Sequence, residues 1–384
     1  MNKLIRITTV PISIHKLLSG QPLFMKNQGF DVKLVSSDGH FISKIELETG
    51  ISVKVIPYSR AITPIADLRS LWLTYKYIKK EKPQIVHTHT PKAGLIGMLA
   101  AYLLNVPIRM HTVAGLPLME TRGIKRRVLN VVERLTSFCA SNVYPNSNAL
   151  KDFMLEEQLC SKSKIKVIGH GSSNGIDLEY YAPSLDTKEK SDKVRKDLGI
   201  NESDFVFGFV GRVVKDKGIS ELVKSFCSLN DSSTHLLIIG PFEEELDSLD
   251  EGIMNEIEKN NHIHHVGYKE DVRPFFMAMN TFVFPSYREG FPNVVLQASA
   301  LSIPSIVSNI NGSNEIINDK VNGLVVPVKN EVSLTKAMFE MYKNNDFRKK
   351  VSSSIRNEIM MKYDQKYIWR ELLKEYNHLL ESNV

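Results

Sequence analysis

The sequence is poor in cysteine and has no paired arrangement of it. Cys139, Cys160 and Cys227 are the only cysteines among 384 residues, and no C-x-x-C motif occurs. Disulfide frameworks and tetrahedral zinc sites require such pairs, so we expect neither. The three thiols are typical of a protein in a reducing compartment, where they serve as small buried side chains.

Other common signatures are also missing. No G-x-G-x-x-G follows a predicted strand and no G-x-x-x-x-G-K-[ST] is present, which argues against a dehydrogenase and a P-loop NTPase. There is no dense Lys/Arg run and no aromatic-spaced RNA motif, so we expect no nucleic-acid partner. His262, His264 and His265 lie on one short predicted strand and cannot converge on one ion, so we expect no metal.

The chain has no long apolar run either. Residues 1–15 contain too many polar residues and a proline to form a signal peptide, and the apolar stretch 93–108 is too short to span a bilayer. We therefore expect a cytoplasmic protein that crosses no membrane. Its formal net charge of +6 suits an anionic ligand or the anionic inner face of the cytoplasmic membrane.

Short β-branched stretches alternate with segments of helical length along the whole chain. The strands we expect are 3–10, 31–37, 52–58, 84–89, 106–112 and 142–147 in the first half, and 204–213, 234–240, 263–268, 281–286, 304–308 and 323–328 in the second. This alternation is typical of parallel sheets covered by helices. A change in composition over 170–193 marks the seam between two such sheets.

We therefore predict an α/β protein with two doubly wound domains that face each other across a cleft. The first domain is expected over 1–175 and the second over 176–364, and a C-terminal helix over 365–384 packs back toward the first domain. In such sheets, ligands bind at the carboxyl ends of the strands.

Two cations follow the first strand of the second domain. Arg212 and Lys217 stand in "RVVKDKG", where a strand runs into a helix. A loop can fold both side chains onto one ligand, and a diphosphate matches the planar fork of Arg and the point charge of Lys. The alternative is a solvated pair of cations near a turn.

A carboxylate follows another strand of the same domain. In "SYREGFPNVVLQASA", Glu289 precedes a Gly-Phe-Pro turn and a predicted helix with Pro292 at its first position. The free N–H groups at that helix start form an anion site, and Glu289 is suited to accept hydrogen bonds from hydroxyls. Gln297, one and a half turns into the helix, can reach another part of the same ligand. A hydroxyl-rich ligand with a diphosphate in its middle is a nucleotide sugar.

These stretches, together with "IVHTHTPKAGLIGMLAA", "HTVAGLPLMETRG", "YPNSNALKDF", "GHGSSNGIDLEYY" and "EIINDKVNGLVVPV", resemble glycosyltransferase family 4 over nearly the full length. These are retaining transferases of the GT-B fold. The chain is most similar to the CapM-like and PglA-like enzymes of bacterial capsule, O-antigen and N-glycan assembly. The resemblance implies a nucleoside-diphosphate-sugar donor, a UDP-sugar, and a polyprenyl-diphosphate-linked saccharide as the acceptor.

The resemblance also implies roles for individual residues. The catalytic set is Arg212, Lys217, Glu289 and His111. The donor-binding set is Gly211, Arg212, Lys217, Glu289, Gly290, Phe291, Pro292, Asn293 and Gln297. On the acceptor side it implies Lys92 and Gly115, and the basic turn Lys125, Arg126 and Arg127 is either a solvated turn or part of a membrane-docking surface. The histidine that relatives place before this glycine is Ala114 here. Of His87 and His89 we expect only one to face the cleft.

Position 297 departs from the pattern of the family, in which a second acid clasps the ribose. An amide accepts at one end and donates at the other, so a weaker contact with a ribose hydroxyl remains. No D-x-D pair is present, and the resemblance implies a metal-independent front-side attack with no protein nucleophile and no cofactor. The glutamine at 297 also favours the alternative to a transferase, which is a catalytically idle homologue or a GT-B epimerase.

Overall fold

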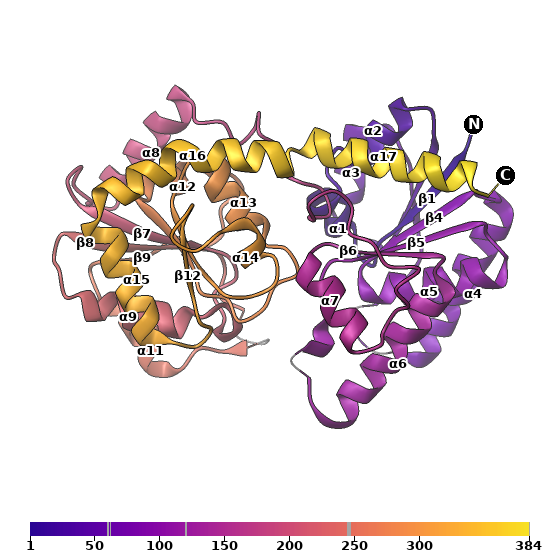
Figure 1. Ribbon diagram of the computed structural model, residues 1–384, viewed down its shortest axis with the longest axis horizontal. Helices are drawn as coiled ribbons and strands as arrows, with labels where there is room; N and C mark the ends of the chain where they lie inside the picture. Colours follow the sequence, from indigo (N-terminus) through magenta and orange to yellow (C-terminus); the bar gives the residue numbers. More distant parts are fainter. Residues whose placement is uncertain (60, 62, 120, 244–246, 384) are drawn as a thin grey trace. The chain divides into compact units, whose positions relative to one another are not determined.

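The computed structural model describes residues 1–384 except 60, 62, 120, 244–246 and 384. The chain forms two compact units. The N-terminal unit comprises Met1–Asn174 and Gln365–Val384, and the C-terminal unit comprises Gly175–Asp364 (Figure 1).

Each unit is built on a parallel sheet of six strands. The sheet of the N-terminal unit has the order β3-β2-β1-β4-β5-β6, and that of the C-terminal unit has the order β12-β11-β10-β7-β8-β9. The strands are β1 (Lys3–Ile7), β2 (Asp31–Ser36), β3 (Val53–Val55), β4 (Ile85–His89), β5 (Ile108–Val113), β6 (Asn142–Pro145), β7 (Phe205–Val210), β8 (Thr234–Ile239), β9 (Ile263–His265), β10 (Thr281–Phe284), β11 (Ser305–Ser308) and β12 (Leu324–Val326). The predicted strands and the doubly wound fold class are confirmed.

Helices cover both faces of each sheet. In the N-terminal unit they are α1 (Pro11–Leu17), α2 (Gln21–Asn27), α3 (Ile42–Thr49), α4 (Pro64–Glu81), α5 (Pro91–Leu103), the 3₁₀ turn η1 (Pro117–Met119), α6 (Gly123–Cys139), α7 (Asn148–Glu156) and α17 (Gln365–Glu381). In the C-terminal unit they are α8 (Leu185–Asp197), the 3₁₀ turn η2 (Lys215–Lys217), α9 (Ile219–Leu229), α11 (Glu251–Lys259), α12 (Arg273–Ala278), α13 (Asn293–Ala300), α14 (Ser313–Ile316), α15 (Glu331–Lys343) and α16 (Asn345–Tyr363).

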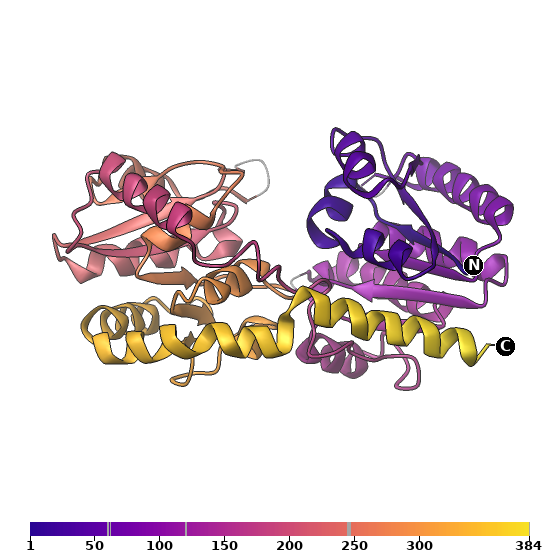
Figure 2. The same cartoon turned by 90° about the horizontal axis from the view of Figure 1, so that it is seen from above.

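The two faces of the N-terminal sheet form separate apolar cores. Ile5 and Ile7 of β1 pack into the cluster beneath α5, whereas Leu4 packs into the cluster that includes Tyr376 of α17. Successive side chains of a strand point to opposite faces, which explains this division. Figure 2 shows α17 running alongside this unit, and together with α1, α2 and α3 it contributes to the apolar cover of one face of the sheet.

A polar layer lies in the core between this sheet and α17. The Nδ1 atom of His87 lies 2.7 Å from the hydroxyl oxygen of Tyr376, and Arg6 Nη2 lies 2.9 Å from His89 Nε2. The rings of His87 and His89 are 4.2 Å apart and both are buried. Burial and the nearby cation Arg6 hold the pKa of both histidines well below the usual range, so both rings are neutral.

We expected only one of His87 and His89 to face the cleft, on the premise that they point to opposite faces of the strand, and that premise is wrong. Residues i and i+2 of a strand share one face, so both rings enter the same layer. Their spacing of two residues therefore places both histidines in one buried layer, and does not direct one of them to the cleft.

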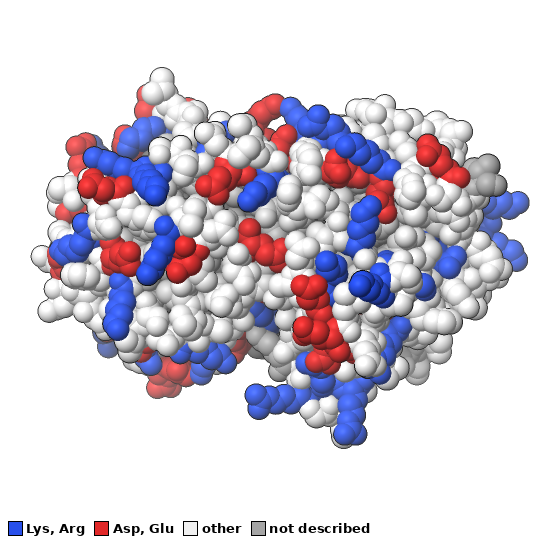
Figure 3. Space-filling view, viewed as in Figure 1, with Lys and Arg blue, Asp and Glu red and all other residues white. Residues whose placement is uncertain are grey.

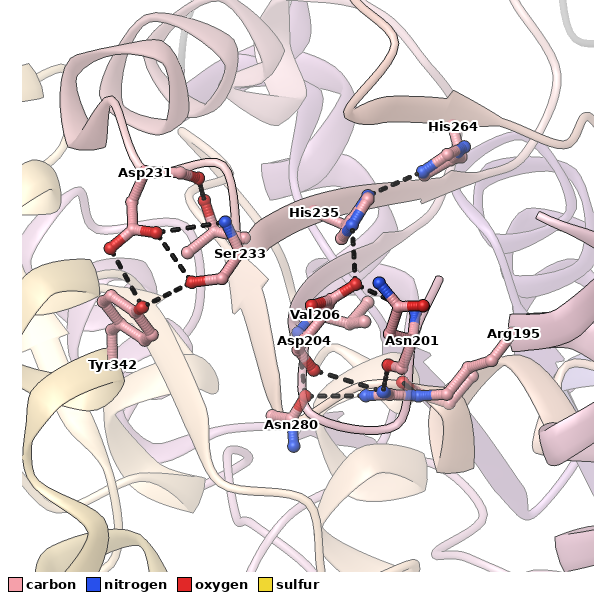
Figure 4. Close-up of polar contacts among 12 residues, drawn as sticks. Arg195, Asn201, Asp204, Val206, Asp231, Ser233, His235, His264, Asn280 and Tyr342 are labelled. Carbon is pink, nitrogen blue, oxygen red and sulfur yellow. Dashed lines mark hydrogen bonds and ion pairs between the residues drawn. The ribbon is translucent and has the colours of Figure 1, made fainter. Parts of the chain in front are cut away.

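A second polar network lies at the amino ends of strands in the C-terminal unit (Figure 4). Arg195 of α8 donates from Nε to the carbonyl oxygen of Ala278 at 3.0 Å, from Nη1 to that of Asp204 at 3.1 Å and from Nη2 to Oδ1 of Asn280 at 2.8 Å. The same Asn280 oxygen accepts from the N–H of Val206 at 2.8 Å. One guanidinium thus ties α8 to the segments before β7 and β10.

Two histidines extend this network. His235 contacts Asp204 through Nε2 at 3.4 Å and His264 through ring nitrogens 3.0 Å apart. Desolvation lowers the pKa of His264 to about 4, so that ring is neutral at physiological pH. Within the described ranges, no group of three or more His, Cys, Asp or Glu residues is placed to hold a metal ion.

We predict that Arg195→Met lowers the free energy of unfolding by about 2–4 kcal/mol, because several acceptors lose a charged donor in a partly buried site. The matched control is Lys196→Met, since this neighbouring side chain on α8 is exposed. Calorimetric unfolding of both variants is the measurement. Equal melting temperatures for the two variants would show that the network contributes nothing to stability.

Candidate active site

The strand order of the C-terminal sheet places two loops side by side. β7 lies between β10 and β8, so the winding direction reverses between β7 and β10. In doubly wound sheets, ligands bind at such a reversal, outside the carboxyl ends of the strands. Residues 211–218 follow β7 and residues 285–292 follow β10, and these two loops contain all the donor-site residues expected from the sequence except Asn293 and Gln297, which lie on the following helix.

Gly218 allows the two loops to touch. It has φ +71°, and a Cβ atom there would lie 2.2 Å from the carbonyl oxygen of Pro285. Any other residue would therefore be strained and would also displace the second loop. A backbone hydrogen bond of 2.8 Å from the N–H of Tyr287 to the carbonyl oxygen of Asp216 also joins the two loops.

Lys217 and Glu289 meet across this contact. The ammonium of Lys217 donates to Oε1 of Glu289, and the hydroxyl of Ser286 donates to the same oxygen at 3.1 Å. The two charged side chains are only 12% and 19% exposed. Among the described residues, Oε2 of Glu289 has no hydrogen-bond donor, so this oxygen is available to accept from a ligand hydroxyl.

Arg212 stands at the start of the first loop and is 39% exposed. Its Nη1 donates to Oε2 of Glu243 at 3.0 Å. Within the part of the chain that the structure describes, its Nε and Nη2 have no acceptor. Glu243 was not predicted as a site residue from the sequence, although it follows β8 and so lies at the same edge of the sheet.

Helix α13 begins directly after the second loop. Pro292 has ψ 105° and is the N-cap, so the expectation that it occupies the first helical position is corrected by one residue. The first N–H groups of a helix have no carbonyl partner within it, and those of Asn293 and Val294 occupy these positions. The side chain of Gln297 is partly exposed, and its amide makes no hydrogen bond to any described residue.

The N-terminal sheet also reverses its winding direction, between β1 and β4. Thr9, after β1, and Thr90, after β4, have hydroxyl oxygens 2.7 Å apart. Thr90 has φ +73°, a conformation that costs a β-branched residue energy and is found mostly where surrounding structure enforces it. Lys92 of α5 forms an ion pair with Asp67 of α4 and is 13% exposed, so the expected acceptor-side cation is already paired.

His111 does not occupy the position expected of a catalytic residue. It is 2% exposed, its Nδ1 lies 2.8 Å from the hydroxyl of Thr88, and its ring fills the space that a side chain at Gly94 would take. Burial lowers its pKa to about 4. It is a core histidine beneath α5, whereas Gly115, two residues after β5, is partly exposed with φ +151°.

The sequence of the chain matches two family models of glycosyltransferases and the sequences of known members. Residues 24–180 match the family model for glycosyltransferase family 4, and residues 190–358 match that for glycosyl transferases group 1. The chain is 36% identical over 383 residues to the capsular polysaccharide biosynthesis glycosyltransferase CapM of Staphylococcus aureus, covering 99% of this chain and 98% of that protein.

A second relative is the UDP-Gal:α-D-GlcNAc-diphosphoundecaprenol α-1,3-galactosyltransferase of Escherichia coli, with 30% identity over 82% of this chain and 80% of that protein. Among solved structures, that of HepE from Anabaena in complex with UDP has a TM-score of 0.82, with 17% identity, covering 98% of this chain and 100% of that one. The fold is therefore GT-B. The chain belongs to glycosyltransferase family 4, and it is a glycosyltransferase.

We predict that Gly218→Ala destabilises the C-terminal unit by about 2–4 kcal/mol, because the added carbon meets backbone and the residue has positive φ. Gly252→Ala is the matched control, since a Cβ atom there meets nothing within 4 Å and the position is helical. Thermal unfolding of both variants measures the effect. A Gly218→Ala protein as stable as the wild type would contradict the close approach of the two loops.

Proposed function

We propose that this glycosyltransferase moves a sugar, an N-acetylhexosamine or related hexose, with retention of configuration. The donor is a nucleoside-diphosphate sugar, a UDP-sugar, and the acceptor is a polyprenyl-diphosphate-linked saccharide in surface polysaccharide biosynthesis. The observation that carries the proposal is the gathering of Arg212, Lys217 and Glu289 at the reversal of the C-terminal sheet. The activity printed for the Escherichia coli relative supports the donor and acceptor classes, and the capsular role of the Staphylococcus aureus relative supports surface polysaccharide biosynthesis.

Arg212 and Lys217 are proposed to hold the diphosphate. Breaking the sugar–phosphate bond leaves negative charge on the departing nucleoside diphosphate, and positioned cations stabilise that charge as it develops. The partially exposed guanidinium of Arg212 has two nitrogens without an acceptor among the described residues, which suits bidentate binding of phosphate. The first N–H groups of α13 add a second source of positive potential, so the proposed reaction uses no metal and no cofactor.

Glu289 is proposed to bind the transferred sugar. Its Oε1 atom is held by Lys217 and Ser286, which fixes the carboxylate while Oε2 accepts from a sugar hydroxyl. The backbone of Gly211 and of residues 290–293 completes the proposed donor site. Gln297 is proposed to contact the ribose through its unbonded amide.

The acceptor side is proposed to lie on the N-terminal unit, near Lys92 and Gly115. His111 is not part of the proposed site, because its ring is buried and hydrogen-bonded to the hydroxyl of Thr88. Within the described residues, no helix is long and apolar enough to cross a membrane. We propose that the protein meets a lipid-linked acceptor by peripheral binding at the inner face of the cytoplasmic membrane.

A second candidate is a catalytically idle homologue or a GT-B epimerase, and the amide at position 297 is the observation that favours it. The deciding experiment incubates the protein with a panel of nucleotide sugars, with and without a polyprenyl-diphosphate-linked saccharide, in excess EDTA. We expect sugar transfer only when the acceptor is present. Conversion of the donor without an acceptor would identify an epimerase, and no conversion under either condition would identify an idle protein.

We predict that Lys217→Ala or Arg212→Ala lowers the transfer rate by roughly a hundredfold to a thousandfold, because each removes a charge that stabilises the leaving group. Lys215→Ala is the matched control, since this lysine lies in the same 3₁₀ turn and pairs with the exposed Asp250. Initial rates at saturating donor are the measurement. Near-normal rates in either variant, with an unchanged melting temperature, would refute the diphosphate assignment.

We predict that Gln297→Glu tightens binding of UDP and of the donor a few-fold, about 1 kcal/mol, by restoring a carboxylate for the ribose. The gain should appear in the Michaelis constant rather than in turnover, because ribose contacts are alike in ground and transition states. Isothermal titration with UDP on both proteins is the measurement. Unchanged affinity would mean that residue 297 does not touch the ribose, and a loss of activity would mean that the amide is required.

A further inference from the structure

Arg6 of β1 carries a positive charge into the core of the N-terminal unit. Its side chain is 1% exposed, and no carboxylate of the described residues forms an ion pair with it. Burial lowers the pKa of Arg6, the direction expected for a cation without a counter-charge. A guanidinium nevertheless keeps its proton at neutral pH, so the charge remains in the core.

The polar groups closest to Arg6 supply no negative charge. Both histidines of the buried layer, His87 and His89, are neutral. Burial raises the pKa of the Tyr376 phenol, so this side chain is neutral as well.

A carboxylate on the same side of the sheet is compensated by a different cation. Oε1 of Glu375 accepts from the hydroxyl of Tyr144 at 2.8 Å, and Oε2 lies 2.6 Å from Nζ of Lys166. Figure 3 shows Lys and Arg side chains at the surface over the part of the N-terminal unit where Figure 1 places α17, and there water solvates them. Arg6 is shielded from water, so the described chain leaves its charge unbalanced.

A cavity of about 20 Å³ lies beside Arg6. A single water needs about 10–15 Å³, so the cavity has room for roughly one or two groups of that size. All the residues that line it belong to the N-terminal unit. A nucleotide, a saccharide or a diphosphate is far too large to enter it.

Donors that lack an acceptor gather around this cavity. Nε and Nη1 of Arg6 and Oγ of Ser173 are buried and have no hydrogen-bond partner among the described residues. Nη2 of Arg6 donates to Nε2 of His89 at 2.9 Å, so the proton of this neutral ring is on Nδ1. Within the part of the chain that the structure describes, this Nδ1 also has no acceptor.

We propose that the cavity beside Arg6 binds a small monovalent anion of the size of chloride. The guanidinium would donate charge-assisted hydrogen bonds to the anion from Nε and Nη1, and His89 and Ser173 would add neutral donors. Water alone would satisfy these donors but would leave a buried charge without a counter-ion. The bound anion would join β1 and β4 to the segment that contains Ser173, and so stabilise the N-terminal unit.

Two acceptors at the cavity set the position of a water beside the anion. Oε1 of Gln21 and Oδ1 of Asn146 are buried and have no donor among the described residues. Their amide nitrogens are already used, since that of Gln21 donates to the carbonyl oxygen of Ser173 and that of Asn146 to the carbonyl oxygen of Ala114. The cavity has room for one water next to the anion, and this water would donate to both acceptors.

Thermal unfolding of the full chain tests the proposal, with sodium chloride compared with sodium gluconate at equal ionic strength. A ligand that binds only the folded state raises the melting temperature as its concentration rises. We expect chloride to raise the melting temperature by about 3–6 °C above its value in gluconate, with saturation. The gluconate anion is too large for the cavity.

Arg6→Met should abolish this dependence on chloride, because it removes the charge and the donors while keeping a long unbranched side chain that a core tolerates. The matched control is Arg109→Met, in β5 of the same sheet. Arg109 donates to the carbonyl oxygens of Cys139 and Val106 and does not line the cavity. The control should keep the full chloride effect whatever its own stability, and equal chloride effects in the two variants would overturn the proposal.

Ser173→Val leaves Arg6 in place and replaces a donor at the cavity with a methyl group. We expect the apparent affinity for chloride to fall by roughly tenfold or more, the value of a hydrogen bond to a charged group. Ser137→Val is the matched control, since Ser137 is a buried serine of α6 that does not line the cavity. Unchanged chloride affinity in Ser173→Val would contradict the proposed position of the anion.

Crystals of the wild-type protein in sodium bromide locate the anion without any variant, because bromide scatters X-rays anomalously. We expect an anomalous peak beside Nε and Nη1 of Arg6. If there is no peak at Arg6, the cavity holds water alone, and if the peak is only beside Arg212, the halide binds the proposed donor site. Either result would overturn the proposal. None of these measurements uses sugar transfer, so their outcome is independent of the proposed function.

Discussion

Gly218 brings the loop after β7 against the loop after β10, and the proposed donor site depends on this contact. A side chain at this position would push Pro285 away and with it the segment that carries Glu289. The ion pair between Lys217 and Glu289 forms only because the two loops touch. Backbone geometry therefore comes first, and the charges are positioned by it.

The pairing of Lys217 with Glu289 also gives the two residues a joint role. The contact fixes one oxygen of the carboxylate and leaves the other free among the described residues, while the ammonium lies beside the position proposed for the diphosphate. In the proposed reaction, this cation orients the sugar-binding carboxylate and the leaving group together, which couples donor binding to the bond that breaks. Arg212 forms an ion pair with Glu243 at the same edge of the sheet. This edge therefore carries two neighbouring ion pairs.

The two edges of the C-terminal sheet differ in how completely their polar side chains are paired. At the carboxyl edge, Arg212 and Gln297 keep hydrogen-bonding groups without partners among the described residues. At the amino edge, Arg195 donates to three acceptors in the two segments before β7 and β10, and His235 lies between Asp204 and His264. Saturated hydrogen bonds stabilise a fold, and unsaturated ones are available to a ligand. In the N-terminal unit, Tyr376 of α17 and the neutral histidines of β4 also form a buried polar layer.

The sequence by itself determined the twelve strands, the parallel sheets and the edge at which Arg212, Lys217 and Glu289 would stand, because strand alternation and strand-end loops are local patterns. It did not determine that Lys217 and Glu289 pair, that Glu243 pairs with Arg212, or that His111 is buried against Gly94. It also did not show that Arg6 is buried without a carboxylate partner among the described residues. Each of these depends on contacts between segments far apart in the chain, and only the tertiary structure decides which segments meet and which face of a helix they cover.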